Sequence, residues 1–229
     1  MPSSFCGNTR ASLEPLSFCS PAHSGNNPQD YSGKTFSISD ASTIQPMEGC
    51  MGKKRALADP SRLKPFDKDN KDLLRVVIET PKGSRNKFAF NPSQQVFELR
   101  KVLPAGMEFP YDFGFVPSTL APDGDPTDVL VLMDEPAFPG CVLLSRIVGA
   151  IEGEQYDKKS RERNDRIIAV EKDAHSFASI KSIDDLGKEF ANELEEFFTN
   201  YHRMWREEFK VLRLTGPKRA RKLVRSTMV

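Results

Sequence analysis

Short apolar stretches separated by turn residues begin near residue 71 and predict a chain rich in β-strands. Some of them alternate apolar and polar residues, as half-buried strands do, while others are continuously apolar and indicate buried strands. The stretches that predict strands are 73–79, 86–90, 95–99, 129–132, 141–151, 166–170 and 209–214. Two segments between them are predicted to be loops: residues 103–114, rich in Pro, Gly and aromatic side chains, and the charged residues 153–163.

The C-terminal region carries apolar residues at helical spacing. Ser182 is typical of a helix N-cap, and Asp184 and Asp185 favour the positive end of the helix dipole. The predicted apolar face consists of Ile183, Leu186, Phe190, Leu194, Phe197, Phe198 and Tyr201. A second helix is predicted after Gly216 and Pro217. Many strands followed by a helix, a strand and a helix predict an α+β fold, in which a closed or nearly closed small barrel hides the strand edges.

Residues 1–60 differ in composition, because Ser, Pro, Gly, Asn and Thr dominate and no apolar periodicity is present. We interpret them as a disordered N-terminal extension, or as a leader assigned from the wrong start codon with Met51 as the alternative start. Residues 61–229 would then form one folded domain. The extension also contains Cys6, Cys19, His23 and Cys50. Their spacing matches no zinc-finger pattern.

Charge and composition exclude several classes of function. The chain of 229 residues has 33 Lys and Arg against 32 Asp and Glu, so it lacks the basic excess that is typical of nucleic-acid binding. No apolar run reaches membrane-spanning length, and the first residues lack the pattern of a secretory signal. The four cysteines form no CxxC pair. We therefore expect a cytoplasmic protein that binds neither nucleic acid nor a membrane.

The most informative stretch is Asp123-Gly124-Asp125-Pro126-Thr127-Asp128, here called the acidic turn, which directly precedes a buried strand. Gly124 and Pro126 favour a turn, so three carboxylates are held close together and repel one another. Oxygen ligands of this kind favour a hard cation such as Mg²⁺, Mn²⁺ or Ca²⁺. A solvated turn is the alternative, because the same residue types are common in turns. An EF-hand is excluded, since its sixth and twelfth positions would hold Asp128 and Asp134 instead of Gly and Glu.

With its neighbours, the acidic turn resembles the signature of the soluble family I inorganic pyrophosphatases. The aromatic segment 109–117, the stretch 77–79 with Lys87, and Phe197-Phe198 followed by Tyr201 resemble other parts of that family. The resemblance implies a small closed OB-like β-barrel flanked by two α-helices. It also implies hydrolysis of pyrophosphate to two phosphates by metal-activated water, with Mg²⁺ as the cofactor and Mn²⁺ as the alternative. We expect pyrophosphate as the partner and a homo-oligomeric assembly.

The resemblance also implies roles for individual residues. The metal ligands would be Asp123, Asp125, Asp128, Glu79, Asp165 and Glu154. The catalytic residues would be Asp125, Asp128, Lys87 and Tyr201. The phosphate groups of the substrate would be bound by Lys87, Lys101, Arg166 and Tyr201.

Several positions depart from the family pattern: Ala89, Phe113, Gln155, Asn164 and His202. The first stands where the family has a second Glu, and Gln155 and Asn164 align with two usual Asp positions. These departures leave a second function open, a degenerate pyrophosphatase fold that binds phosphate compounds or a protein without turnover. An OB-type binder of single-stranded nucleic acid is a third alternative, which the aromatic segment permits but the neutral net charge and the acidic turn oppose.

Overall fold

A computed structural model describes residues 59–156 and 161–229. The predictions for residues 1–58, with their cysteines and His23, concern residues outside this range, so the extension and its boundary stay predictions. The described residues form a mainly β structure with two α-helices. None of the helices described has both the length and the apolarity needed to span a bilayer.

The elements lie close to the predicted positions. The strands are β1 Leu73–Thr80, β2 Asn86–Asn91, β3 Val96–Val102, β4 Asp112–Phe115, β5 Asp128–Leu132, β6 Val142–Tyr156, β7 Arg161–Arg163, β8 Arg166–Glu171 and β9 Glu208–Thr215. The helices are α1 Gly187–Met204 and α2 Pro217–Ser226, with 3-10 turns η1 Pro60–Arg62 and η2 Ile183–Leu186. Ser182 caps η2, which leads into α1, and forms a capping box with Asp185.

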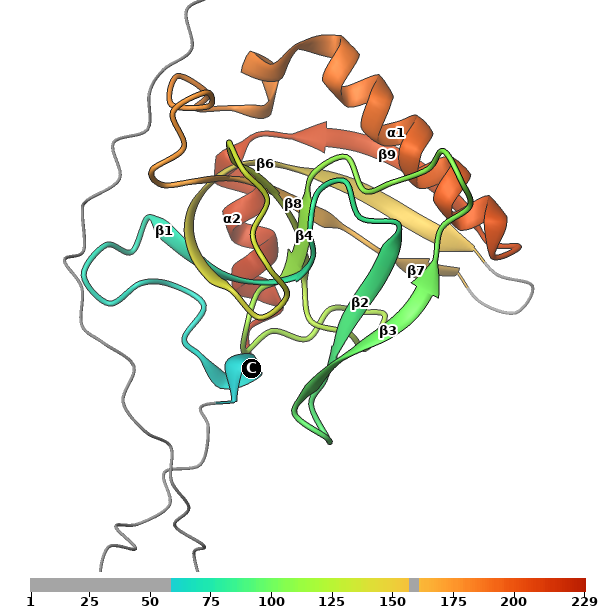
Figure 1. The fold of residues 1–229 in the computed structure, drawn as a ribbon. Coiled ribbons are helices and arrows are strands. Elements are labelled where there is room, and N and C mark those ends of the chain that lie inside the picture. Colours follow the sequence, from blue (N-terminus) through green and yellow to red (C-terminus); the bar gives the residue numbers. More distant parts are fainter. Residues whose placement is uncertain (1–58, 157–160) are drawn as a thin grey trace, which may run out of the picture. The chain divides into compact units, whose positions relative to one another are not determined.

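Five of the strands are connected in a ring by their pairing. β1 pairs with β4, β4 with β5, β5 with β8, β8 with β6, and β6 again with β1. Only the β5–β8 pair is parallel. β7 and β9 extend the sheet along the distal part of β6, and β2 and β3 form a separate hairpin that lies beside the ring (Figure 1).

The sheet buries apolar residues on both faces, which explains its continuously apolar strands. Along β5, Leu130 belongs to the core packed against α1, while Val129 belongs to the core packed against α2. Ile168 and Ile167 divide in the same way along β8. We call these the α1 side and the α2 side of the sheet. Because side chains alternate along a strand, Asp128 and Arg166 share the α1 side with Leu130 and Ile168.

Two loop predictions were wrong. β4 lies within the aromatic segment, and all of its residues are buried. Gly114 allows β4 to pair closely with β1, because a Cβ atom there would collide with the carbonyl oxygen of Val77. In the charged segment 153–163, β6 continues to Tyr156 and β7 follows after the gap in the described residues. Its charges are compatible with strands because they pair across them, as Glu154 does with Arg161 at 2.6 Å.

Candidate active site

A cavity of about 510 Å³ opens between the acidic turn, the end of β1 and the β2–β3 hairpin. Five of the residues predicted for the site line it: Glu79, Lys87, Lys101, Asp125 and Asp128. The remaining lining residues include Ala89, Arg100, Phe90 and Phe115. Segments almost fifty residues apart in the sequence therefore bring their charged side chains to one place.

The acidic turn is fixed by its own hydrogen bonds. Gly124 has a φ of 86°, in the region that favours glycine. The backbone N–H of Asp125 donates to Oδ1 of Asp123 at 3.2 Å. The backbone N–H of the buried Thr127 donates to Oγ1 of Thr119 at 2.9 Å. Asp128 then begins β5, so the backbone of the last carboxylate is held by the sheet.

The carboxylates of the cavity are poorly compensated. Burial, with a smaller contribution from neighbouring carboxylates and against the opposing charge of Lys87, raises the pKa of Asp128 to about 6 and that of Glu79 to about 7. Burial and the charge of Asp125 also raise the pKa of Asp123. The described residues contain no group of three or more His, Cys, Asp or Glu side chains already arranged as metal ligands. Glu79 and Asp128 thus line a cavity in which negative charge is unfavourable, and the described residues offer no preformed ligand set there.

Lysine side chains border the same cavity. Lys87 Nζ lies 5.0 Å from the ring centre of Phe113 and 5.5 Å from that of Tyr201. Although burial works against its charge, Tyr201, Asp128 and Glu79 raise the pKa of Lys87, so it stays protonated. Lys101 Nζ lies 4.3 Å from the ring centre of Trp205. These ammonium groups are suited to an anionic ligand.

Arg166 lies next to Asp128, on the side of that carboxylate that is buried in the protein. Arg166 is only 3% exposed, and the central carbon of its guanidinium lies 4.1 Å from the ring centre of Phe198 and 4.4 Å from that of Phe209. Its Nε lies 3.8 Å from Oδ2 of Asp128. The two side chains lie near each other because Asp128 and Arg166 are direct neighbours across the parallel β5–β8 pair.

A comparison with known families decides what kind of protein this is. A family model described as inorganic pyrophosphatase matches residues 76–229. The chain belongs to the inorganic pyrophosphatase family.

Relatives and solved structures agree with this assignment. The chain is similar to an inorganic pyrophosphatase from Synechocystis sp., with 39% identity over 140 residues that cover 61% of this chain and 80% of that protein. It is 34% identical over 152 residues to one from Geobacillus stearothermophilus, which covers 66% of this chain and 90% of that protein. The crystal structure of the inorganic pyrophosphatase from Thermus thermophilus matches with a TM-score of 0.68 and 33% identity, over 75% of this chain and 97% of that one.

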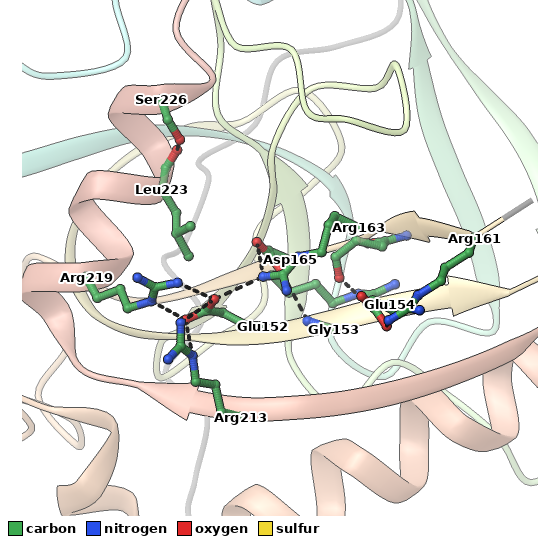
Figure 2. Close-up of polar contacts among 12 residues, drawn as sticks. Glu152, Gly153, Glu154, Arg161, Arg163, Asp165, Arg213, Arg219, Leu223 and Ser226 are labelled. Carbon is green, nitrogen blue, oxygen red and sulfur yellow. Dashed lines mark hydrogen bonds and ion pairs between the residues drawn. The ribbon is translucent and has the colours of Figure 1, made fainter.

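Two carboxylates that were expected among the metal ligands, Asp165 and Glu154, lie on the α2 side of the sheet instead of beside the cavity. Asp165 accepts a hydrogen bond from the backbone N–H of Gly153 at 3.0 Å and pairs with Arg163 at 2.8 Å. Glu154 accepts hydrogen bonds from Arg161 and, at 2.7 Å, from Tyr156. Figure 2 shows both carboxylates among arginines. Strand alternation explains the placement, because Asp165 is one residue from Arg166 and therefore points away from the cavity.

The same arginine cluster surrounds Glu152, which is 1% exposed. Glu152 accepts hydrogen bonds from Arg163, Arg213 and Arg219, and these tie β6, β9 and α2 together (Figure 2). The hydrogen bonds, that of Arg219 first, lower the pKa of Glu152 to about 2. Glu152 is thus a fully compensated carboxylate.

Residues that the sequence did not mark as functional lie close to Lys101 and Arg166. Tyr201 and His202 were singled out in the sequence, but Trp205, Glu207 and Phe209 were not. Glu207 lies between α1 and β9, accepts a hydrogen bond from Gln155 at 3.1 Å, and lies 3.0 Å from Nδ1 of His202. No motif marks Glu207, and folding alone brings it to His202, which in turn contacts Arg166.

Proposed function

We propose that this cavity hydrolyses inorganic pyrophosphate to two phosphates. The carrying observation is that Glu79 and Asp128, whose pKa values are raised by burial, share a cavity with Lys87 and Lys101. The carboxylates favour bound cations, and the ammonium groups beside them favour an anion. Such a site is suited to a highly charged phosphoanhydride that binds together with metal ions.

The donor set fits a hard divalent cation. Carboxylate oxygens are the ligands that Mg²⁺ prefers, and the raised pKa values of Asp123 and Asp128 mean that a bound cation would relieve an existing electrostatic penalty. We propose that Glu79, Asp123, Asp125 and Asp128 hold Mg²⁺, with Mn²⁺ as the alternative. Such a cation lowers the pKa of a water molecule and neutralises charge on the phosphates. Glu154 and Asp165 are left out of this set, since arginines already compensate them.

Side chains of the protein would accept the proton and bind the substrate. In the proposed reaction the oxygen of a water molecule attacks phosphorus, the bridging P–O bond breaks, and the Asp128 carboxylate accepts the proton of the water. Lys87 and Lys101 bind the phosphate oxygens, and Tyr201, which lies against Lys87, donates a hydrogen bond to one of them. Arg166 compensates the charge of Asp128 from the protein side.

The finer structural expectations belong to the same proposal. We propose that the five-stranded ring of pairings is the small closed OB-like barrel implied by the resemblance, since every strand of the ring has two neighbours in it. The homo-oligomer and the cytoplasmic location stay predictions.

Phosphate release from pyrophosphate by the purified full chain is the direct test. We expect turnover with Mg²⁺, none after removal of metal with EDTA, and a large loss in Glu79→Gln. The single tryptophan, Trp205, lies against Lys101 and reports binding independently through its fluorescence. A folded protein whose fluorescence responds to pyrophosphate, but which releases no phosphate with Mg²⁺ or Mn²⁺, would instead be a binding module without turnover.

A further inference from the structure

The guanidinium of Arg166 is a buried cation whose orientation needs a structural cause. Contact with the rings of Phe198 and Phe209 removes it from water, and its Nε has no hydrogen-bond partner among the described residues. Ring contacts of this kind are not hydrogen bonds, so the direction in which Nε points depends on the hydrogen bonds of the two Nη atoms. Nη1 donates to the backbone oxygen of Asn164 at 3.3 Å.

His202 accepts the other, shorter hydrogen bond of the guanidinium. Nη2 of Arg166 lies 3.0 Å from Nε2 of His202. A guanidinium can only donate, so Nε2 must accept and carry no proton. A neutral imidazole then has its proton on Nδ1, which lies 3.0 Å from Oε2 of Glu207 and donates to it. Burial, with the nearby charge of Arg166, agrees with a neutral ring because it lowers the pKa of His202 to about 3.

Further contacts hold this arrangement in place. The His202 ring stacks on Phe209 with centroids 5.1 Å apart and an interplanar angle of 15°. Gly153 makes room for Phe209, since a Cβ atom there would collide with the ring. Glu207 also accepts from Gln155, whose Oε1 accepts from Asn164 at 2.8 Å. Gln155 and Asn164 therefore continue the chain of hydrogen bonds that runs from Arg166 through His202 and Glu207.

We propose that His202 and Glu207 are positioning residues: Glu207 fixes the Nδ1–H tautomer of His202, and His202 aims Arg166 at Asp128. Neither residue lines the cavity. This inference rests on the proposed function for its effect on catalysis, but the tautomer can be tested without turnover.

Kinetics of two His202 variants separate positioning from packing. His202→Gln retains an acceptor near the position of Nε2, whereas His202→Leu is apolar and of similar size. We expect kcat/KM for pyrophosphate to fall by about 10- to 100-fold in His202→Leu, as removal of a hydrogen bond to a charged group implies, and His202→Gln to be several times more active. If His202 only fills space, the order reverses, because a buried site tolerates Leu better than Gln. Equal or higher activity of His202→Leu would overturn the proposal.

A double-mutant cycle tests whether His202 acts through Arg166. In an Arg166→Ala background, His202→Leu should reduce kcat/KM by less than about twofold, because the group to be positioned is gone. Full additivity of the two effects would contradict the proposal. The matched control is His175→Leu, an exposed histidine outside the cavity, which should retain the wild-type kcat/KM.

The tautomer itself is visible in nitrogen NMR of histidine-labelled protein. The chain has three histidines, and the resonances missing from His202→Gln identify the ring of interest. At neutral pH we expect the Nδ1–H tautomer in the wild type and a mixture of tautomers in Glu207→Leu, with Glu208→Leu as the neighbouring control. An Nε2–H ring or an imidazolium would overturn the proposal, even in a protein that hydrolyses pyrophosphate. If the wild type does not hydrolyse pyrophosphate, the function proposed above fails, and the tautomer still decides this inference.

Discussion

The two sides of the sheet hold carboxylates in opposite electrostatic environments. On the α1 side, Asp128 faces the cavity and burial raises its pKa to about 6. On the α2 side, hydrogen bonds from arginines, with that of Arg219 the largest influence, lower the pKa of Glu152 to about 2. The protein itself therefore compensates Glu152, which contributes stability. Among the described residues, Arg166 and Lys87 are the counter-charges of Asp128, which is suited to take a cation from solution.

The largest expected effect is on catalysis by Asp128→Asn. The substitution retains the volume of the side chain but removes the charge that holds metal and accepts the proton. We expect phosphate release with Mg²⁺ to fall by about 10²- to 10⁴-fold. The metal-free variant should be at least as stable as the wild type at pH 7, and Mg²⁺ should raise its melting temperature less.

Both readouts are needed for the comparison. Phosphate release measures the chemical role, and melting curves with and without Mg²⁺ measure metal binding. Wild-type activity in a folded Asp128→Asn protein would remove the cavity from consideration as the active site. A matched substitution on the other side of the sheet, Asp165→Asn, controls for the loss of one carboxylate.

The next largest effect is on stability, in Glu152→Gln. This change leaves Arg163, Arg213 and Arg219 without their shared carboxylate. Breaking a buried ion pair costs about 3–5 kcal/mol, and the partial exposure of these arginines reduces this to about 2–3 kcal/mol. Denaturant unfolding should show this loss, while the folded variant should retain most of its activity. A stable but inactive Glu152→Gln would show that the α2 side takes part in the chemistry.

A smaller effect is the pH dependence of stability without metal. The pKa of Glu79 is raised from 4.5 to about 7 and that of Asp128 from 3.8 to about 6. Raised carboxyl pKa values mean that the unfolded chain releases these protons first, so their contribution to stability is fully present below about pH 4 and is lost as the pH rises through 6 to 7. Glu152 does not oppose this trend, because its contribution is constant above pH 4.5.

We therefore expect the melting temperature of the EDTA-treated protein to fall by about 5 °C between pH 4.5 and 7. The fall should be smaller in Asp128→Asn and smaller again for the wild type with saturating Mg²⁺. Melting curves over this pH range are sufficient for the measurement. A stability that rises over the same range would show that these carboxylates are compensated in the metal-free protein.

Local sequence patterns predict much of this fold and part of its site. The acidic turn points to Asp128 from its own residues, whereas Glu79 was expected only through the resemblance to the family; both line the cavity. β4 could not be predicted, because its pairing depends on how closely Gly114 approaches a distant strand. Glu207 could not be predicted either, since its contact with Gln155 spans 52 residues and no local pattern marks it.

The charged segment shows why the second group of site residues was harder to place. The sequence offers Glu154 and Asp165 as acidic residues in this segment. Whether either can bind metal in the cavity depends on the side of the sheet to which its side chain points. In a strand, a shift of one residue exchanges the two sides. Arg166 therefore lies beside Asp128 on the α1 side, while Asp165, the residue before it, accepts a hydrogen bond from Gly153 and pairs with Arg163.

The smallest expected effect follows from this alternation and concerns Asp165→Asn. The amide oxygen of Asn can still accept the hydrogen bond from Gly153, so only the ion pair with Arg163 is lost. Because the arginine is partly exposed and retains Glu152 as a partner, the loss of stability should be about 0.5–1 kcal/mol. The Mg²⁺ concentration that gives half-maximal phosphate release should change by less than about twofold, since the carboxylate points away from the cavity. A Mg²⁺ titration of Asp165→Asn beside Asp128→Asn measures this directly. If Asp165→Asn requires tenfold more Mg²⁺, then Asp165 reaches the metal in the working enzyme, and the separation of the two sides of the sheet does not hold during catalysis.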